Sequence, residues 1–115
     1  MKRNLAQRLG QVLAAAGILW PLHASPQAAE PEALRTRGLA ASCAACHGTE
    51  GRAVDAAVPG LAGLPAAYIA GQMKAFKSGS RPATVMHQLA RGYSDAQIDA
   101  LAAYFTAQPP AGESR

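Results

Sequence analysis

The sequence is poor in cysteine and in large side chains. Its 115 residues include two cysteines, Cys43 and Cys46, and only two phenylalanines, three tyrosines and one tryptophan. A short chain with so few bulky residues forms a thin hydrophobic core, and such domains often depend on a disulfide, a metal or a cofactor for stability. The two cysteines are therefore candidates for holding a group that is structural as well as functional.

The sequence also lacks an apolar run long enough to cross a membrane. The longest, Leu9 to Trp20, has 12 largely apolar residues, whereas a transmembrane helix needs about 20. Three basic residues precede the run and small residues follow it, which is typical of an export signal (Lys2, Arg3 and Arg8 form the basic start). We expect no stable membrane span.

The end of this signal is not sharply defined. Candidate cleavage points follow Ala24, Ala28 and Ala29, so we expect residues 1–29 to be a cleaved signal peptide ending between 24 and 29, and residues 30–115 to form one domain. No cysteine lies near these points and no Arg-Arg pair occurs, which excludes a lipid-modified N-terminus and gives no sign of export in a folded state. The expected location is the periplasm.

No excess of charge of one sign remains once the signal is set aside. Three of the 11 basic residues lie in the signal, which leaves eight basic against seven acidic residues from Glu30 onward. No aromatic residues are interleaved with a basic stripe. We therefore do not expect nucleic-acid binding.

No stretch alternates polar and apolar residues, which argues against strands. Helical spacing and capping residues predict an all-α protein with three or four short helices: about Glu32 to Ser42, Pro65 to Gly79, a turn near Val85 to Arg91, and a helix capped by Ser94 and ended by Pro109-Pro110. The last helix has an apolar stripe of Ile98, Leu101, Ala102 and Phe105. Residues 48–64 form a glycine-rich loop, long enough to imply a function.

Three kinds of site fit a C-x-x-C pair: zinc, a redox dithiol and haem. Zinc needs four ligands, and in the expected mature domain only His87 remains after Cys43, Cys46 and His47. A redox dithiol normally follows a strand, which this pattern lacks. Haem uses the whole Cys-x-x-Cys-His motif: the two thiols form thioethers to the haem, and His47 supplies the fifth iron ligand. We favour one covalently attached haem c.

An electron carrier needs a sixth iron ligand, and because Met1 and His23 lie in the expected signal, the candidates are Met73, Met86 and His87. Met73 lies in the apolar stripe of a predicted helix, so we expect it to fill the core. Met86 follows a loop that is able to lay its thioether against the haem, and it is our predicted axial ligand with His47. His/Met ligation raises the reduction potential and closes both faces of the iron, which suits electron transfer.

Two further groups of residues bear on the site. A ligating histidine usually donates its other ring N–H to a carbonyl, and the Pro59-Gly60 turn offers the carbonyl of Pro59 to His47, although this turn is also an ordinary loop break. Basic residues flank Met86 and are candidates for steering an acidic partner, or for a solvated face: Lys74, Lys77, Arg81 and Arg91.

The ordered series "CAACHGTEG", "PGLAGLPAAYIAGQMKAFKSGSR", Met86 and "GYSDAQIDALAAYF" resembles a small class I cytochrome c, close to cytochrome c553 and to single domains of dihaem cytochrome c4. The resemblance implies a fold in which the first and last helices cross, with Leu39 and Tyr104 or Phe105 near the crossing. Many members have an aromatic residue four positions before the first cysteine, where this chain has Leu39.

The stretch "FKSGSRPATVMHQLARGYSD" is similar to the region around the axial methionine in the cytochrome subunit of flavocytochrome c sulfide dehydrogenase. That resemblance implies a non-enzymatic subunit that accepts electrons from a flavoprotein, with no catalytic residues of its own. The alternatives are a free-standing c553/c4-like shuttle between respiratory complexes and, from another class, a haem-based ligand sensor or peroxidase-like enzyme.

Overall fold

The computed structural model describes residues 29–112. The expected signal peptide thus lies almost wholly outside the described residues. Five α-helices and two short 3-10 helices occur in the described part: α1 (Ala29–Ala41), α2 (Ala44–His47), η2 (Thr49–Gly51), α3 (Ala66–Ser78), α4 (Met86–Leu89), η3 (Ala90–Gly92) and α5 (Asp95–Thr106). Residues 29–112 contain no strand, so the predicted all-α class is confirmed.

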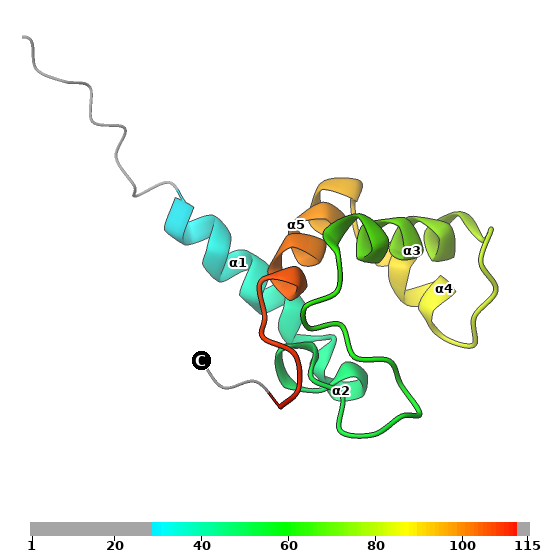
Figure 1. The fold of residues 1–115 in the computed structure, drawn as a ribbon. Helices are drawn as coiled ribbons and strands as arrows, with labels where there is room; N and C mark the ends of the chain where they lie inside the picture. Colours follow the sequence, from blue (N-terminus) through cyan, green and yellow to red (C-terminus); the bar gives the residue numbers. More distant parts are fainter. Residues whose placement is uncertain (1–28, 113–115) are drawn as a thin grey trace, which may run out of the picture.

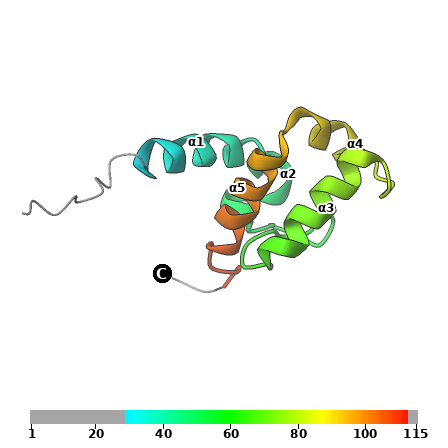
Figure 2. The ribbon, with the colours of Figure 1, turned by 90° about the horizontal axis from the view of Figure 1, so that it is seen from above.

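The three longer helices form the frame of the domain. Helix α5 packs against both α1 and α3, and α4 packs beneath α3 (Figure 1). Seen from above, α1 and α3 lie on opposite sides of α5 (Figure 2). Most of the small core lies where these helices meet: Ala40, Ile69, Leu101, Ala102 and Phe105, with Leu39 and Tyr104 packed against it. The predicted crossing of the first and last helices is therefore confirmed.

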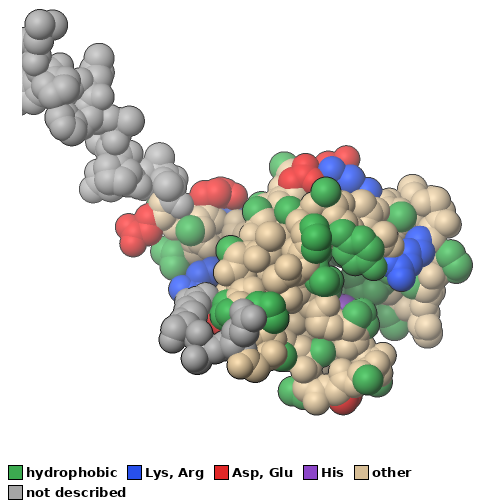
Figure 3. Space-filling view, in the orientation of Figure 1, with side chains coloured by type: hydrophobic (Ala, Val, Ile, Leu, Met, Phe, Trp, Pro, Cys, Tyr) green, Lys and Arg blue, Asp and Glu red, His purple; other side chains and the backbone are tan. Residues whose placement is uncertain are grey.

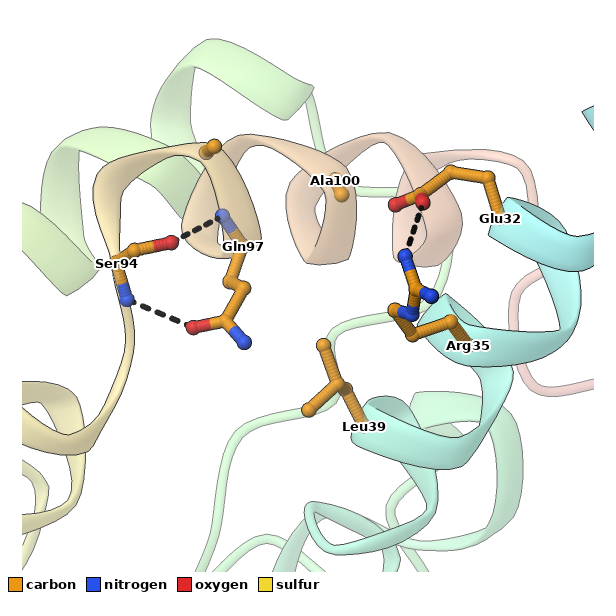
Figure 4. A pocket seen from close by; sticks show the side chains of 7 residues that line it. Glu32, Arg35, Leu39, Ser94, Gln97 and Ala100 are labelled. Carbon is orange, nitrogen blue, oxygen red and sulfur yellow. Dashed lines mark hydrogen bonds and ion pairs between the residues drawn. The ribbon is translucent and has the colours of Figure 1, made fainter.

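Helix α5 has the caps and the buried face that its sequence predicts. The Ser94 side chain accepts a hydrogen bond from the Gln97 backbone N–H, and the Gln97 side chain accepts one from the Ser94 N–H (Figure 4). This capping box satisfies two donors at the start of the helix. The predicted stripe is buried in full, from Ile98 through Leu101 and Ala102 to Phe105.

Other boundaries differ from the prediction. Helix α1 begins at Ala29, three residues before the expected start at Glu32. Pro65 is the N-cap residue of α3 and lies outside its first turn. The helix count also rises to five in residues 29–112, because the Cys-Ala-Ala-Cys-His segment, which the sequence indicated as a turn, closes one helical turn as α2.

The long loop 48–64 is attached to α5 and to itself. The Gly63 N–H donates to the Phe105 carbonyl oxygen at 2.9 Å, and the Thr106 hydroxyl donates to the Leu64 carbonyl oxygen at 2.7 Å. The carbonyl oxygen of Gly51 accepts from two N–H groups later in the loop, those of Leu61 and Ala62. The loop path is therefore fixed by the core helix even though only η2 is regular within it.

Within residues 29–112, no helix combines the length and the apolar character that crossing a bilayer requires. The apolar run Leu9 to Trp20 lies outside the described residues.

Candidate haem-attachment site

The Cys-Ala-Ala-Cys-His segment joins the end of α1 to the loop 48–64. Cys43 is the N-cap residue of α2, and His47 is its last residue. Cys43 is half-buried and packs against the core, whereas Cys46 is exposed. Both cysteines are free thiols. The turn therefore presents two unpaired thiols and an imidazole within five consecutive residues, one thiol anchored in the core and the other on the surface.

The imidazole of His47 has one nitrogen already engaged. Its Nδ1 lies 2.7 Å from the carbonyl oxygen of Pro59, which can only accept a hydrogen bond. Nδ1 therefore carries the proton and donates it, and Nε2 is left as the nitrogen with a free lone pair. This is the arrangement that a metal-ligating histidine normally has, with a carbonyl fixing the tautomer and the ring orientation.

The chain turns sharply directly after His47. Gly48 has φ 78°, and a Cβ there would lie 1.9 Å from the Arg52 carbonyl oxygen. No side chain fits at this position, so glycine is required for the loop to fold back toward the histidine. Glu50 and Arg52 close the same turn with a half-buried ion pair of 2.6 Å.

The environment of Cys43 does not favour a redox dithiol. Burial raises the pKa of the Cys43 thiol above its ordinary value, and the hydrogen bond to Ser42 only partly offsets this. Reactive cysteines instead have a lowered pKa. Within residues 29–112, no group of three or more His, Cys, Asp or Glu side chains is arranged to hold a bare metal ion.

One contact near the first cysteine was not foreseen. The Ser42 hydroxyl lies 2.9 Å from the Tyr93 hydroxyl, and it also donates to the Leu39 carbonyl oxygen at 2.7 Å. This bridge ties the residue before Cys43 to the segment before α5. No sequence signal identifies it, because the partners are 51 residues apart.

The candidates for a sixth ligand lie on a different part of the fold. Met86 is the first residue of α4 and is half-buried, and His87 follows it. Met73 is half-buried in the middle of α3, four residues after the buried Ile69. In Figure 1 both α2 and α4 lie below the α3 and α5 pair. Figure 3, drawn in the same orientation, shows a recess on the face toward the viewer, with hydrophobic side chains around it and a histidine visible inside it.

Three of the four basic side chains near Met86 are already paired within the chain. Lys74 donates to Asp99 and Lys77 to Asp95, each at 2.7 Å. Arg81 lies over the Phe76 ring and donates a hydrogen bond to the side-chain oxygen of Gln72. Because the charges of Lys74 and Lys77 are neutralised within the chain, the structure favours the second of the two interpretations, a solvated face, over a basic docking patch.

The donor set fits covalently held haem. Two unbridged thiols separated by two residues would form the thioethers, and the free Nε2 of His47 is of the kind that binds haem iron. A small core such as this one would gain stability from a large apolar group. Fold and site together define an all-helical haem c protein.

The comparisons with known proteins agree with this class. The family model described as "Cytochrome c" matches residues 36–107. The chain belongs to the cytochrome c family, a family of electron carriers, and its cofactor is haem c.

Several curated relatives are similar to the chain. It is 41% identical over 115 residues to the thiosulfate dehydrogenase electron acceptor of Thiomonas intermedia (strain K12), a match that covers 98% of this chain and 50% of that protein. It is 42% identical over 67 residues to the cytochrome subunit of sulfide dehydrogenase of Chlorobaculum tepidum, covering 58% of this chain and 60% of the subunit. Cytochrome c4 of Azotobacter vinelandii is 35% identical over 103 residues, covering 82% of this chain and 47% of the relative.

The chain spans about half the length of most of these relatives. The similarity therefore concerns one haem c domain. What the longer proteins do as wholes bears on this chain only as a proposal.

Proposed function

We propose that the chain is a one-electron carrier whose single haem c is attached to Cys43 and Cys46 and whose iron is ligated by His47 and Met86. The domain that does this comprises residues 30–115, released in the periplasm after removal of residues 1–29. The haem supplies a ferric/ferrous couple when bound. The protein itself breaks and forms no substrate bonds, so it is not an enzyme in this proposal.

The observation that carries the proposal is the hydrogen bond from His47 Nδ1 to the Pro59 carbonyl oxygen. It fixes the tautomer and keeps Nε2 unprotonated for iron, while the two thiols of the same turn stay free for thioether formation. The carbonyl also makes the imidazole a stronger donor to iron. A histidine placed by chance after C-x-x-C would have no need of such a partner.

Met86 is supported over the other two candidates by what surrounds them. Nδ1 of His87 is buried and has no hydrogen-bond partner in the described part of the chain. If His87 were the iron ligand, its ring would have no carbonyl partner to orient it, whereas the ring of His47 has the Pro59 carbonyl. Met73 shares a helix face with the buried Ile69, four residues earlier, which favours a packing role. Met86 begins α4 immediately after a loop and is free of both objections.

Closing both iron faces with His47 and Met86 would favour electron transfer over chemistry at the iron, because no position is left open for oxygen or peroxide. A ligand sensor or peroxidase needs a site that opens. Rapid binding of carbon monoxide by the reduced protein at neutral pH would contradict the carrier proposal.

Three matched variants test the ligation. In the oxidised protein, thioether ligation gives a weak far-red sulfur-to-iron charge-transfer band. Met86→Leu should abolish this band and lower the reduction potential, because the soft sulfur ligand is lost. Met73→Leu and His87→Gln should keep the band. A band that survives in Met86→Leu, or disappears only in Met73→Leu, would refute the assignment.

We further propose that the electron donor is a flavoprotein that oxidises sulfide. The similarity to the cytochrome subunit of a sulfide dehydrogenase supports this donor. A second candidate donor is a thiosulfate dehydrogenase, which is favoured by the 41% identity to an electron acceptor of that enzyme over nearly the whole chain. A free-standing shuttle between respiratory complexes is the third candidate, supported by the similarity to cytochrome c4.

A reduction assay separates the donors. The oxidised protein is mixed with catalytic amounts of a flavoprotein sulfide dehydrogenase and sulfide, or of a thiosulfate dehydrogenase and thiosulfate, and haem reduction is followed optically. Mixtures without dehydrogenase correct for direct reduction by sulfide. The sulfide-donor proposal fails if only the thiosulfate system, or neither, accelerates reduction.

A further inference from the structure

The segment that delivers Met86 is attached to α3 only in its first half. Helix α3 ends at Ser78, and residues 79–85 lead to Met86 at the start of α4. Within the described chain, residues 82–84 make no hydrogen bond. Pro82 fixes one backbone angle but removes a donor. The last residue attached to α3 before Met86 is therefore Arg81.

Arg81 is attached to α3 through both its backbone and its side chain. Its N–H donates to the Ala75 carbonyl oxygen at 3.1 Å, which folds the chain back over the end of the helix. Its guanidinium carbon lies 4.6 Å from the centroid of the Phe76 ring, and its Nη1 donates to the Gln72 side-chain oxygen. The planar guanidinium thus stacks on a ring and donates in its own plane at once, a combination that lysine cannot reproduce.

We propose that Arg81 is a positioning residue for the axial ligand: by clamping the 79–85 segment onto Phe76 and Gln72 of α3, it holds the Met86 sulfur at the iron. The inference rests on the proposed ligation by Met86. A thioether is a neutral donor, so its occupancy of the iron depends on how well the protein keeps it in place. Replacing the Arg81 side chain leaves the backbone bond to Ala75 in place but removes the contacts with Phe76 and Gln72, so the segment is held less firmly and the effective concentration of the sulfur at the iron falls.

Competition by exogenous imidazole measures this effect. Imidazole binds the oxidised iron only when Met86 has left, so its apparent affinity reports how firmly the segment is held. Removing the ring contact and one hydrogen bond with Arg81→Leu should raise the apparent imidazole affinity about tenfold, with a weaker sulfur-to-iron band. Arg81→Lys should lie between Arg81→Leu and the unaltered protein, and Phe76→Leu should show part of the effect.

Arg91→Leu is the matched control, because Arg91 is exposed, lies close to Met86 in the sequence and has no ion pair in the described part of the chain. It should leave imidazole affinity unchanged. Unfolding in guanidinium is measured in parallel for every variant. If Arg81→Leu lowers stability while imidazole affinity and the band stay as in the unaltered protein, Arg81 is merely structural and the inference is wrong.

Failure of the inference and failure of the proposed ligation give different results. If Met86→Leu retains the charge-transfer band, the ligation itself is refuted. If Met86→Leu loses the band but the Arg81 and Phe76 variants bind imidazole as the unaltered protein does, only the positioning role is overturned. Should Arg81→Leu fail to accumulate, Arg81→Lys and Phe76→Leu still decide the matter.

Discussion

Replacing Gly51 with alanine should destabilise the protein strongly, because this glycine lies where the long loop meets the core. Gly51 is buried, has φ 79°, and its carbonyl oxygen accepts from the N–H groups of Leu61 and Ala62. A Cβ at this position would lie 2.8 Å from Cδ1 of Phe105 and 2.9 Å from the Ala62 nitrogen. Neither neighbour has room to move, since Phe105 is 2% exposed and the nitrogen belongs to the bonded loop.

Two costs combine in Gly51→Ala. The left-handed backbone costs about 1–2 kcal/mol for a residue with a side chain, and forcing a methyl group into a packed core costs about 1–3 kcal/mol. We therefore expect a loss of about 2–5 kcal/mol in the free energy of unfolding. The same substitution at Gly38 is the control, because Gly38 lies in α1 and a Cβ there meets nothing within 4 Å. Gly38→Ala should gain about 0.5–1 kcal/mol.

The measurement is guanidinium unfolding of the haem-loaded protein followed by far-ultraviolet circular dichroism. The two alanine variants should move in opposite directions. A Gly51→Ala protein within about 0.5 kcal/mol of the unaltered one, which is the range of ordinary surface substitutions, would refute the account of the loop.

Three further predictions concern other contacts. Tyr93→Phe should lower the free energy of unfolding by about 0.5–1.5 kcal/mol, because the hydrogen bond to Ser42 is lost. In a double-mutant cycle measured by guanidinium unfolding, the same substitution should have no effect in a protein that already carries Ser42→Ala. The hydrogen bond from Lys77 lowers the pKa of Asp95 below its ordinary value of 3.8. The ionised carboxylate therefore stabilises the folded protein above that pH, and this stability is lost as the pH falls through the lower pKa of the folded state. The melting temperature should drop below about pH 4 more steeply than in Asp95→Asn, and equal slopes would contradict the pairing. Leu39→Phe should extend into the open cleft between α1 and α5 beside Leu39 (Figure 4) and raise stability by about 1 kcal/mol in guanidinium unfolding, whereas a loss would show that the cleft does not admit the ring.

The chemistry of the site could be predicted from a few adjacent residues. The thiols of Cys43 and Cys46 and the imidazole of His47 lie within one turn, so their spacing alone limits what they are able to hold. The capping box of Ser94 and Gln97 is equally local, and α5 was predicted well for that reason. Interactions within one helical turn depend on little outside it.

The helix boundaries were predicted less well. The sequence placed the start of the first helix at Glu32, three residues after its position in the structure, and it indicated α2 only as a turn. The first error concerns a helix end and the second a helix of only four residues, and in both cases the difference in free energy between helix and turn is small, so packing decides.

The sequence by itself determined the class of the protein: an all-helical haem c domain, with an attachment turn whose residues are consecutive. Only the tertiary structure decided how the rest of the chain serves that turn. Tyr93 meets Ser42, and Arg81 folds back over Phe76. Sequence spacing indicates neighbours along one helix or strand, whereas a contact such as that between Tyr93 and Ser42, 51 residues apart, depends on chain paths that close only when the helices pack.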